Sequence, residues 1–292
     1  MPSPADPVAF AVIGVAIRWY ALFILSGIAA AIWLVRELAR RRGMDPEFPL
    51  DLAPWLVFSG IAGARGYYLL LRFDYYRRHP EQAINLRLGG LTIHGALAAG
   101  TVVLLVLCRR AGYRVLAWAD LIVVGVALGQ AIGRWGNWAN QEAFGTPTGF
   151  PWGVAIDPAR RPPAFADATR FHPTFIYESL FDLANAGLLA WIVLRMPRHR
   201  FWREGDALWL YLLFYGVARL AIERIRTDSL RIGPLPAAYW VSFGLIAIGA
   251  GAFVARHTRW PGHPADPVSP PPESPDAAPP GGSVASGRRD RA

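Results

Sequence analysis

Apolar stretches alternate with short polar connections along most of the chain, and seven of them are long enough to predict membrane-spanning helices. A helix crosses the hydrocarbon core of a bilayer with about 20 mostly apolar residues. The seven stretches are residues 17–35, 52–71, 92–108, 115–133, 173–194, 205–222 and 236–255. The apolar run at 8–17 is too short to cross separately, so we expect it to lie along the membrane interface.

Polar side chains occur inside or at the ends of six of these stretches. They are Arg18 with Tyr20, Arg65, His94, Arg134 with Asn137, Tyr177 with Glu178, and Arg219 with Glu223. A charged side chain at bilayer depth costs roughly 2.5–3.5 kcal/mol, so charges at such depth usually face a bundle interior or a water-filled cavity. The pattern therefore predicts a polar cavity inside a helical bundle, and a functional site within it.

The composition indicates a polytopic membrane protein. Hydrophobic residues make up 53% of the chain and charged residues 17%, against about 25% charged residues in a soluble domain. All 30 basic residues are arginine, which excludes a Schiff-base lysine and favours planar contacts to phosphate. The only cysteine, Cys108, excludes an internal disulfide and a cysteine-rich metal site. No basic residue precedes the first apolar run, so we do not expect a cleaved signal peptide.

Arginines flank every second connection between the stretches and predict the orientation of the chain. The arginines of these connections are Arg36, Arg40, Arg41, Arg42, Arg109, Arg110, Arg114, Arg195, Arg198, Arg200, Arg203, Arg256 and Arg259. The positive-inside rule places these loops and the C-terminus in the cytoplasm and the N-terminus outside. The outer connection at 72–91 also contains four arginines, an excess that the rule does not account for.

Two segments are not expected to cross the membrane. Residues 135–172 are rich in Gly and Pro, which predicts an extracytoplasmic cap. Residues 261–292 consist mainly of Pro, Ala, Asp, Ser and Gly, which predicts a disordered cytoplasmic tail. The predicted architecture is an all-α polytopic membrane protein with about seven transmembrane helices in a catalytic domain at 1–260, followed by that tail.

With this orientation the polar residues gather at the outer ends of the helices. Two sets also have helical spacing: Tyr215, Arg219, Glu223 and Arg226, and Gln130, Arg134, Asn137 and Gln141. Each set forms one stripe if the helix continues that far. An ordinary solvated helix end with i, i+4 ion pairs would give the same spacing, but two stripes at one membrane face favour a shared site.

Four motifs resemble, in order, those of the prolipoprotein diacylglyceryl transferase family. They are GLTIHGALAAG at 90–100, GRWGNWANQEAFG at 133–145, HPTFIYES at 172–179 and YGVARLAIERIRTD at 215–228. The string GRxGNxxNxE is the most specific of them. The chain departs from the family pattern at Ala96, where a second Gly is common, and at Thr227, where Pro is common. Neither position bears a polar group that the chemistry needs.

This resemblance implies an enzyme of the bacterial cytoplasmic (inner) membrane that needs no cofactor. It implies transfer of a diacylglyceryl group from phosphatidylglycerol to the lipobox cysteine thiol of a preprolipoprotein signal peptide, with release of glycerol phosphate. Its partners would be these two substrates and membrane lipids, with no role for nucleic acid. A substrate thiol is only slightly ionised at neutral pH, so a proton acceptor is needed.

The family's roles can be assigned to residues of this chain. The expected catalytic residues are His94, which would accept the thiol proton, and Arg134 and Arg219, which would hold the phosphate. The expected substrate-binding residues are Tyr20, Arg134, Asn137, Glu142, Gly145, Tyr215 and Glu223. Within that set, we expect Glu142 and Glu223 to orient neighbouring arginines.

Several residues also have plain structural interpretations. His94 would equally serve as a helix cap, and Arg65 is expected to form a buried ion pair with Asp120 or Glu178. His172 is expected to set up a helix start before Pro173, and Cys108 to be inert. The alternative for the whole chain is a membrane transporter, or an anion channel or lipid-binding protein with an outward-facing arginine-lined cavity. A transporter would place such residues near the midplane rather than at the outer ends.

Overall fold

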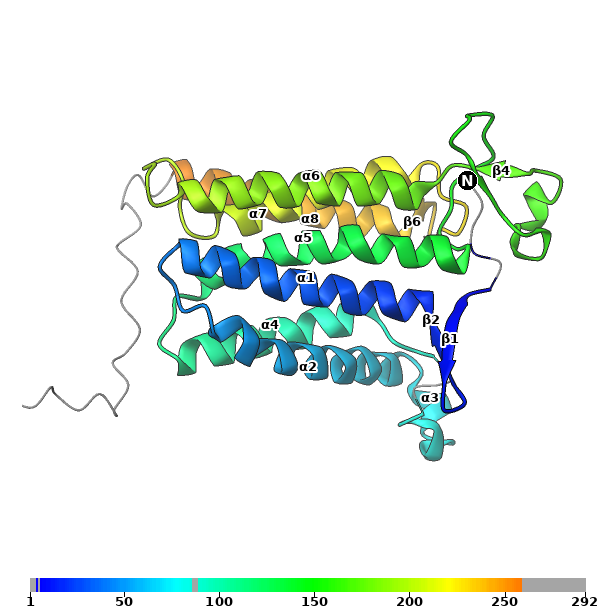
Figure 1. Cartoon of the computed structure of the whole chain (residues 1–292), viewed down its shortest axis with the longest axis horizontal. Coiled ribbons are helices and arrows are strands. Elements are labelled where there is room, and N and C mark those ends of the chain that lie inside the picture. Colours follow the sequence, from blue (N-terminus) through cyan, green and yellow to red (C-terminus); the bar gives the residue numbers. More distant parts are fainter. Residues whose placement is uncertain (1–3, 5, 86–88, 259–292) are drawn as a thin grey trace, which may run out of the picture.

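The computed structural model of the chain describes residues 4, 6–85 and 89–258, and its main feature is a bundle of long helices that run side by side (Figure 1). The long helices are α1 (Trp19–Arg41), α2 (Phe48–Leu71), α4 (Ile93–Arg110), α5 (Val115–Asn140), α6 (Thr174–Arg195), α7 (Asp206–Glu223) and α8 (Ala237–Thr258). Each coincides with one predicted stretch. The largest difference is in α5, which continues to Asn140, past the predicted end at residue 133.

Five of the described helices are apolar and long enough to cross a membrane by length and composition: α1, α4, α5, α6 and α8. The helix α7 holds three charged residues within its 18 residues, Asp206, Arg219 and Glu223. The helix α2 mixes Tyr, Gly, Pro and Arg with its apolar residues. The membrane character is therefore confirmed by five candidate spans, and the full set of seven remains a prediction.

The fold is mostly helical, as predicted, with only short antiparallel strand pairs beside the helices. The first pair, β1 (Val8–Val12) and β2 (Val15–Arg18), occupies the apolar run before α1. Its two-residue loop, Ile13–Gly14, has positive φ at both positions, 49° and 77°, which is the backbone geometry that favours a tight hairpin. The other pairs are β3 (Val154–Ala155) with β4 (Arg170–Phe171), and β5 (Arg231–Ile232) with β6 (Leu235–Pro236).

The helix α5 lies at the centre of the bundle, between α1 and α6 in Figure 1 and against α7. Its buried residues are mostly small or branched and apolar, and they join the main hydrophobic core. Close packing uses glycine: a methyl group added at Gly27 of α1 would lie 2.9 Å from the carbonyl oxygen of Gly129. Small residues of this kind allow helix backbones to approach closely where apolar burial alone does not drive association.

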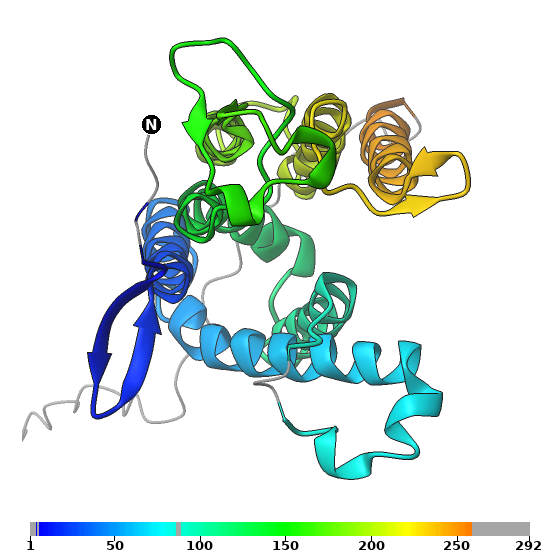
Figure 2. The ribbon, with the colours of Figure 1, turned by 90° about the vertical axis from the view of Figure 1, so that its right-hand side faces the viewer.

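A compact lobe follows α5 at one end of the bundle (Figures 1 and 2). It contains β3, β4 and the short 3-10 helices η3 (Pro158–Arg160) and η4 (Pro163–Phe165). It has its own small core, formed by Phe144, Val154, Ile156, Phe171 and Phe175. The cap was predicted to begin at residue 135, but α5 continues to Asn140, and the lobe begins at Gln141, whose φ of 51° ends the helix. We call residues 141–173 the cap lobe; its extracytoplasmic location remains a prediction.

The opposite end of the bundle carries the connections 42–47, 111–114 and 196–205 (Figure 1). There, the buried carboxylate of Asp120 in α5 accepts hydrogen bonds from the backbone N–H groups of Gly205, at 2.6 Å, and Leu208, at 2.9 Å. Asp120 therefore supplies acceptors for the first N–H groups of α7, which have no partner inside their own helix. The predicted tail at 261–292 lies outside the described residues.

Candidate active site

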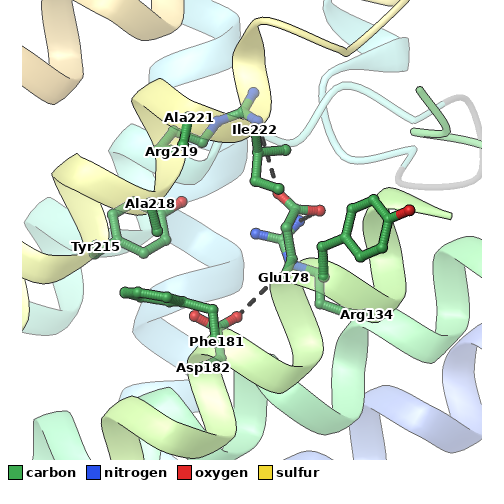
Figure 3. Close-up of a pocket in the computed structure, with 10 residues that line it drawn as sticks. Arg134, Glu178, Phe181, Asp182, Tyr215, Ala218, Arg219, Ala221 and Ile222 are labelled. Carbon is green, nitrogen blue, oxygen red and sulfur yellow. Dashed lines mark ion pairs between the residues drawn. The ribbon is translucent and has the colours of Figure 1, made fainter. Parts of the chain in front are cut away.

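A cavity of about 160 Å³ lies between α5, α6 and α7. Figure 3 shows its lining, in which arginine, carboxylate and tyrosine side chains from three helices face one another. The lining residues are Arg134, Tyr177, Glu178, Phe181, Asp182, Tyr215, Ala218, Arg219, Ala221 and Ile222. The predicted residues Arg134, Tyr215 and Arg219 are therefore brought together, as the spacing of polar residues indicated.

Glu178 of α6 connects the arginines of this cavity. Its carboxylate lies 3.3 Å from Nη1 of Arg134, 3.6 Å from Nη1 of Arg219 and 3.7 Å from Nη1 of Arg226. Its side chain is only 6% exposed. One buried carboxylate thus holds cations from α5, from α7 and from the segment after α7 in one group.

Two further carboxylates approach the same arginines. Nη2 of Arg219 lies 2.7 Å from Glu223, one helical turn away, and Nε of Arg134 lies 3.9 Å from Asp182 of α6. Glu223 therefore orients an arginine, as expected. Asp228 pairs with Arg226 at 2.7 Å. Burial lowers the pKa of Arg226, but the Asp228 hydrogen bond and the nearby carboxylates raise it overall, so this residue stays a cation.

Several polar atoms of this cluster have no hydrogen-bond partner. Nη1 of Arg219, Oε2 of Glu178 and Oδ2 of Asp182 are buried and lack one in the described part of the chain. The contacts of Glu178 at 3.3–3.7 Å are also longer than the roughly 2.7–2.9 Å of a charge-assisted hydrogen bond. Buried polar atoms without partners are costly, so these atoms have unused hydrogen-bonding capacity beside the cavity.

The stripe predicted on α5 is correct for its first three residues. Gln130 accepts a hydrogen bond from the hydroxyl of Tyr211, Arg134 lines the cavity, and Asn137 donates to Glu142 at 3.1 Å. Gln141 lies past the helix end, where its side chain accepts a hydrogen bond from the backbone N–H of Asp157 in the cap lobe. Its role is therefore to hold the lobe rather than to continue the stripe.

The stripe predicted on α7 also loses its last member. Tyr215, Arg219 and Glu223 share one helix, but α7 ends at Glu223, so Arg226 belongs to the following segment. That segment forms an isolated β-bridge between Arg226 and Gly145. Arg226 consequently reaches Glu178 from outside the helix.

In the described part of the chain, Glu142 pairs with asparagine amides rather than with an arginine, which corrects our expectation. Its Oε1 accepts hydrogen bonds from the side-chain amides of Asn137, at 3.1 Å, and Asn140, at 3.2 Å. Both amides belong to the last turn of α5, where asparagine side chains stand beside the loop that carries Glu142. Glu142 therefore fixes the junction between α5 and the cap lobe.

Tyr20 and Gly145 lie at tight contacts near this junction. A methyl group added at Gly136 would come within 2.6 Å of the Tyr20 ring, so that ring packs against the last turns of α5. The backbone N–H of Gly145 donates to the carbonyl of His172 at 2.9 Å, and a methyl group at Gly145 would lie 2.9 Å from the carbonyl oxygen of Ile225. Gly145 thus lets the cap lobe approach the segment after α7.

His94 lies in the first turn of α4 and is exposed. Its ring centroid is 6.4 Å from that of Tyr67 in α2, and it is not among the described residues that line the cavity. The structure therefore does not join His94 to the arginine cluster. The imidazole that is linked to the cavity belongs to His172, whose Nδ1 lies 3.2 Å from the hydroxyl of Tyr177.

Arg65 is buried, as predicted, but its partners are not the predicted carboxylates. Its guanidinium donates to backbone carbonyls within 82–85 and 89–90, while Asp120 binds the start of α7 and Glu178 binds other arginines. Carbonyl groups carry enough partial negative charge to satisfy a guanidinium, and a sequence does not show which of them will be near. The other two structural interpretations fit: Pro173 stands at the start of α6, and Cys108 is buried.

No specific role in the site was predicted for Glu178 or Asp182, which line the cavity, or for Asn185, which follows them along α6. These three residues step by four and three along α6 and are all buried. The spacing test that gave the stripes on α5 and α7 would have found this third stripe as well. The family motif that ends at Ser179 includes Glu178, but it does not reach Asp182.

Fold and site together define a protein of apolar helices that are long enough to cross a membrane, with an arginine–carboxylate cavity built by three of its helices. A family model described as prolipoprotein diacylglyceryl transferase matches residues 7–255, and the chain belongs to this family of transferases.

Curated relatives carry the same designation along most of their length. A protein of Acaryochloris marina is 43% identical over 245 residues, which cover 84% of this chain and 88% of the relative. A Gloeobacter violaceus protein is 44% identical over 238 residues, with 81% and 87% covered. A Finegoldia magna protein is 36% identical over 244 residues, with 84% and 93% covered. Each is named phosphatidylglycerol–prolipoprotein diacylglyceryl transferase, which confirms the resemblance of the motifs and disfavours a transporter.

Proposed function

We propose that this chain transfers the diacylglyceryl group of phosphatidylglycerol to the thiol of a lipobox cysteine in a prolipoprotein. Membership of the transferase family supports the reaction class, and the names of the relatives support the two substrates. The cavity between α5, α6 and α7 supports the chemistry, because it holds the arginines that a phosphate leaving group requires.

The reaction needs one bond to form and one to break. The thiolate sulfur attacks the glyceryl carbon that bears the phosphate ester, and the carbon–oxygen bond breaks. The electron pair leaves with the oxygen as glycerol phosphate, and the thiol proton passes to a base. No oxidant or reductant is required, so the protein has only to bind, orient and neutralise charge.

Arg134 and Arg219 are the proposed phosphate ligands. A guanidinium fits phosphate with two parallel N–H donors, and such donors act most strongly where water is excluded. The observation that carries this proposal is the buried Nη1 of Arg219, a residue that lines the cavity. This atom has no hydrogen-bond partner among the described residues, and the carboxylate of Glu178 lies 3.6 Å away. A phosphate oxygen would supply that acceptor and relieve the long contacts to Glu178.

The carboxylates around the arginines have a compatible role. Glu178, Asp182 and Glu223 hold the guanidinium groups in place before the lipid arrives. This arrangement costs some phosphate affinity, but the arginines need no reorganisation when charge develops on the leaving group. The proposed substrate-binding residues around that centre remain Tyr20, Asn137, Glu142, Gly145, Tyr215 and Glu223.

His94 remains the proposed proton acceptor, on the strength of the family motif at 90–100. It occupies the first turn of α4, which begins at the same end of the bundle as the cap lobe (Figure 1). The contacts of a general base often form only when substrate is bound. His172 is the second candidate, because its ring is hydrogen-bonded to a tyrosine that lines the cavity.

We also propose that the chain lies in the bacterial cytoplasmic membrane with its N-terminus outside and its C-terminus in the cytoplasm. Three connections with arginines in them or at the adjoining helix ends, at 42–47, 111–114 and 196–205, share the bundle end opposite to the cap lobe (Figure 1). The positive-inside rule supports a cytoplasmic location for that end. The cavity and cap lobe would then face the compartment into which prolipoproteins are exported.

The direct test uses the purified chain in phosphatidylglycerol vesicles with a synthetic peptide that carries a lipobox cysteine. We expect mass spectrometry to show a thioether-linked diacylglyceryl peptide, and glycerol phosphate to appear in equal amount. The same peptide with serine in place of cysteine should give no product. A lack of product with the cysteine peptide, under conditions in which the protein is folded, would contradict the proposed reaction.

A further inference from the structure

The guanidinium of Arg65 is the most completely hydrogen-bonded cation in the described part of the chain. Nε donates to Ala83 at 2.8 Å, Nη1 to Gly89 at 2.7 Å and Gly90 at 3.3 Å, and Nη2 to Gln82 at 2.8 Å and Asn85 at 3.3 Å. All five acceptors are backbone carbonyls. A guanidinium has five N–H donors in a fixed plane, so each one has a partner.

The loop that Arg65 binds has no apolar core in its described part, and the buried guanidinium of Arg65 holds it together instead. None of the described residues at 72–85 is buried, and Ile84 is 87% exposed, whereas Arg65 itself is only 6% exposed. The rings of Tyr68 and Tyr76 stand 5.8 and 5.2 Å from its guanidinium carbon, within the range of a cation–π contact. The described part of this loop is therefore organised around one cation.

The same turn of α2 also fixes the start of α4. The carbonyl of Ala64 accepts hydrogen bonds from both the backbone N–H, at 3.2 Å, and the hydroxyl, at 3.1 Å, of Thr92. Gly63 and Gly95 pack so closely that a methyl group on either would overlap the backbone of the other. His94 stands between Thr92 and Gly95, so the residues on both sides of it are held by α2.

We infer that Arg65 is a positioning residue for the transfer reaction, acting through His94. By holding the carbonyls of residues 82, 83, 85, 89 and 90, it sets where α4 begins and hence where the imidazole of His94 stands. Lysine cannot replace it, because an ammonium offers three donors at one point and cannot reach five carbonyls spread around the edge of a planar group. The inference rests on the proposed role of His94 and extends it to a residue that does not touch substrate.

The test compares Arg65→Lys and Arg65→Gln with Arg72→Gln, an exposed arginine of the same helix end. We expect both Arg65 variants to lose about 10²-fold in kcat, because a shift of about 1 Å in a reacting group is worth that much. The KM for phosphatidylglycerol should stay unchanged, since Arg134 and Arg219 are untouched. Arg72→Gln should behave as wild type. A full rescue by lysine would overturn the inference, since charge alone would then suffice.

Limited proteolysis at Arg77 and Arg78 tests the loop independently of catalysis. Cleavage should accelerate by about tenfold or more in Arg65→Gln, because losing even one or two hydrogen bonds favours the open loop. Thermal unfolding in detergent should show that the bundle itself is still folded. Unchanged cleavage would overturn the inference, because the loop would not depend on Arg65.

A double variant separates positioning of His94 from any other effect. If Arg65 acts through His94, Arg65→Lys combined with His94→Gln should be no slower than the slower single variant. Multiplied losses would overturn the inference. The inference would also be overturned if the His94→Gln enzyme were fully active while the Arg65→Lys enzyme was slow. An inactive wild-type chain would instead contradict the proposed function itself, and the proteolysis result would still report on the loop.

Discussion

Glu178 is the residue on which the arginine cluster depends most. It is the only described carboxylate that lies within 4 Å of all three arginines, Arg134, Arg219 and Arg226. Each arginine comes from a different segment, so the carboxylate also links α5, α6 and the end of α7. Removing one partner of a buried ion pair usually costs about 3–5 kcal/mol, because the other charge stays buried without compensation.

Glu178→Gln should therefore lower both stability and activity. We expect a loss of roughly 3 kcal/mol in the free energy of unfolding, measured by denaturation in detergent. Glu223→Gln should be milder, since glutamine keeps a hydrogen-bond acceptor for Arg219 and Glu178 still provides charge. If the two variants unfold alike and transfer alike, Glu178 is not the organising residue.

The proton acceptor can be identified from the pH dependence of the rate. If His94 removes the thiol proton, His94→Gln should be slow at pH 7 and recover as pH rises toward the thiol pKa near ~8.5, where the thiolate forms unaided. Phosphatidylglycerol binding should be retained. His172→Gln serves as the comparison, and the same recovery there, without it in His94→Gln, would assign the role to His172.

Individual residues show where sequence reasoning succeeds and where it fails. Arg134, Tyr215 and Arg219 were predicted to share a cavity and do so, because helical spacing fixes which side chains share a face. Arg65 was given the wrong partners because a sequence pairs charges with charges, whereas this cation binds backbone carbonyls of a loop. His94 was predicted at the same membrane face as the arginines. The structure places it at the start of α4 and outside the described lining of the cavity, so its catalytic role stays a prediction.

At the scale of elements, the helices were predicted well because apolar length is a strong local signal. The errors lie at their ends. The helix α5 runs past its apolar stretch because Trp135 and Trp138 pack on the small core of the cap lobe. The helix α7 ends at Glu223, before Arg226. The hairpin of β1 and β2 was missed because it depends on backbone geometry at Ile13 and Gly14 that hydropathy does not reveal.

The contact between the cap lobe and the segment after α7 should depend on Gly145. In Gly145→Ala, the added methyl would lie 2.8 Å from Cβ of His172 and 2.9 Å from the carbonyl oxygen of Ile225, so one of them must move. We expect a loss of about 1–3 kcal/mol in stability and reduced transfer. The matched control is Gly149→Ala in the same lobe, where a methyl meets nothing within 4 Å. Equal behaviour of the two variants would show that this contact is not needed.

At the scale of the whole molecule, the two ends of the bundle differ in what they carry. One end has the cap lobe, the hairpin of β1 and β2, and α3 (Phe73–Tyr76); the other has the connections at 42–47, 111–114 and 196–205 (Figure 1). This arrangement agrees with the alternation that the arginines predicted. Which end faces the cytoplasm is a property of the membrane and follows only from the positive-inside rule.

Reporter fusions test this orientation. A reporter placed after Arg42, Arg114 or Arg203 should report a cytoplasmic location, and one placed within 146–170 should report the outside. The reason for this expectation is that arginines flank the connections that follow α1, α4 and α6. The reverse pattern would place the cavity on the wrong side for an exported thiol and would contradict the proposed site.

We propose that Arg134 and Arg219 hold the phosphate as it leaves, and the rates of thioether formation by lysine variants decide whether they do. Lysine keeps the charge but loses the planar pair of donors, so Arg134→Lys and Arg219→Lys should each fall by about 10²–10³ in rate. Arg224→Lys, at an exposed arginine next to Glu223, should match wild type. Near-normal turnover of Arg134→Lys or Arg219→Lys, with product formed by the wild type, would contradict the claim.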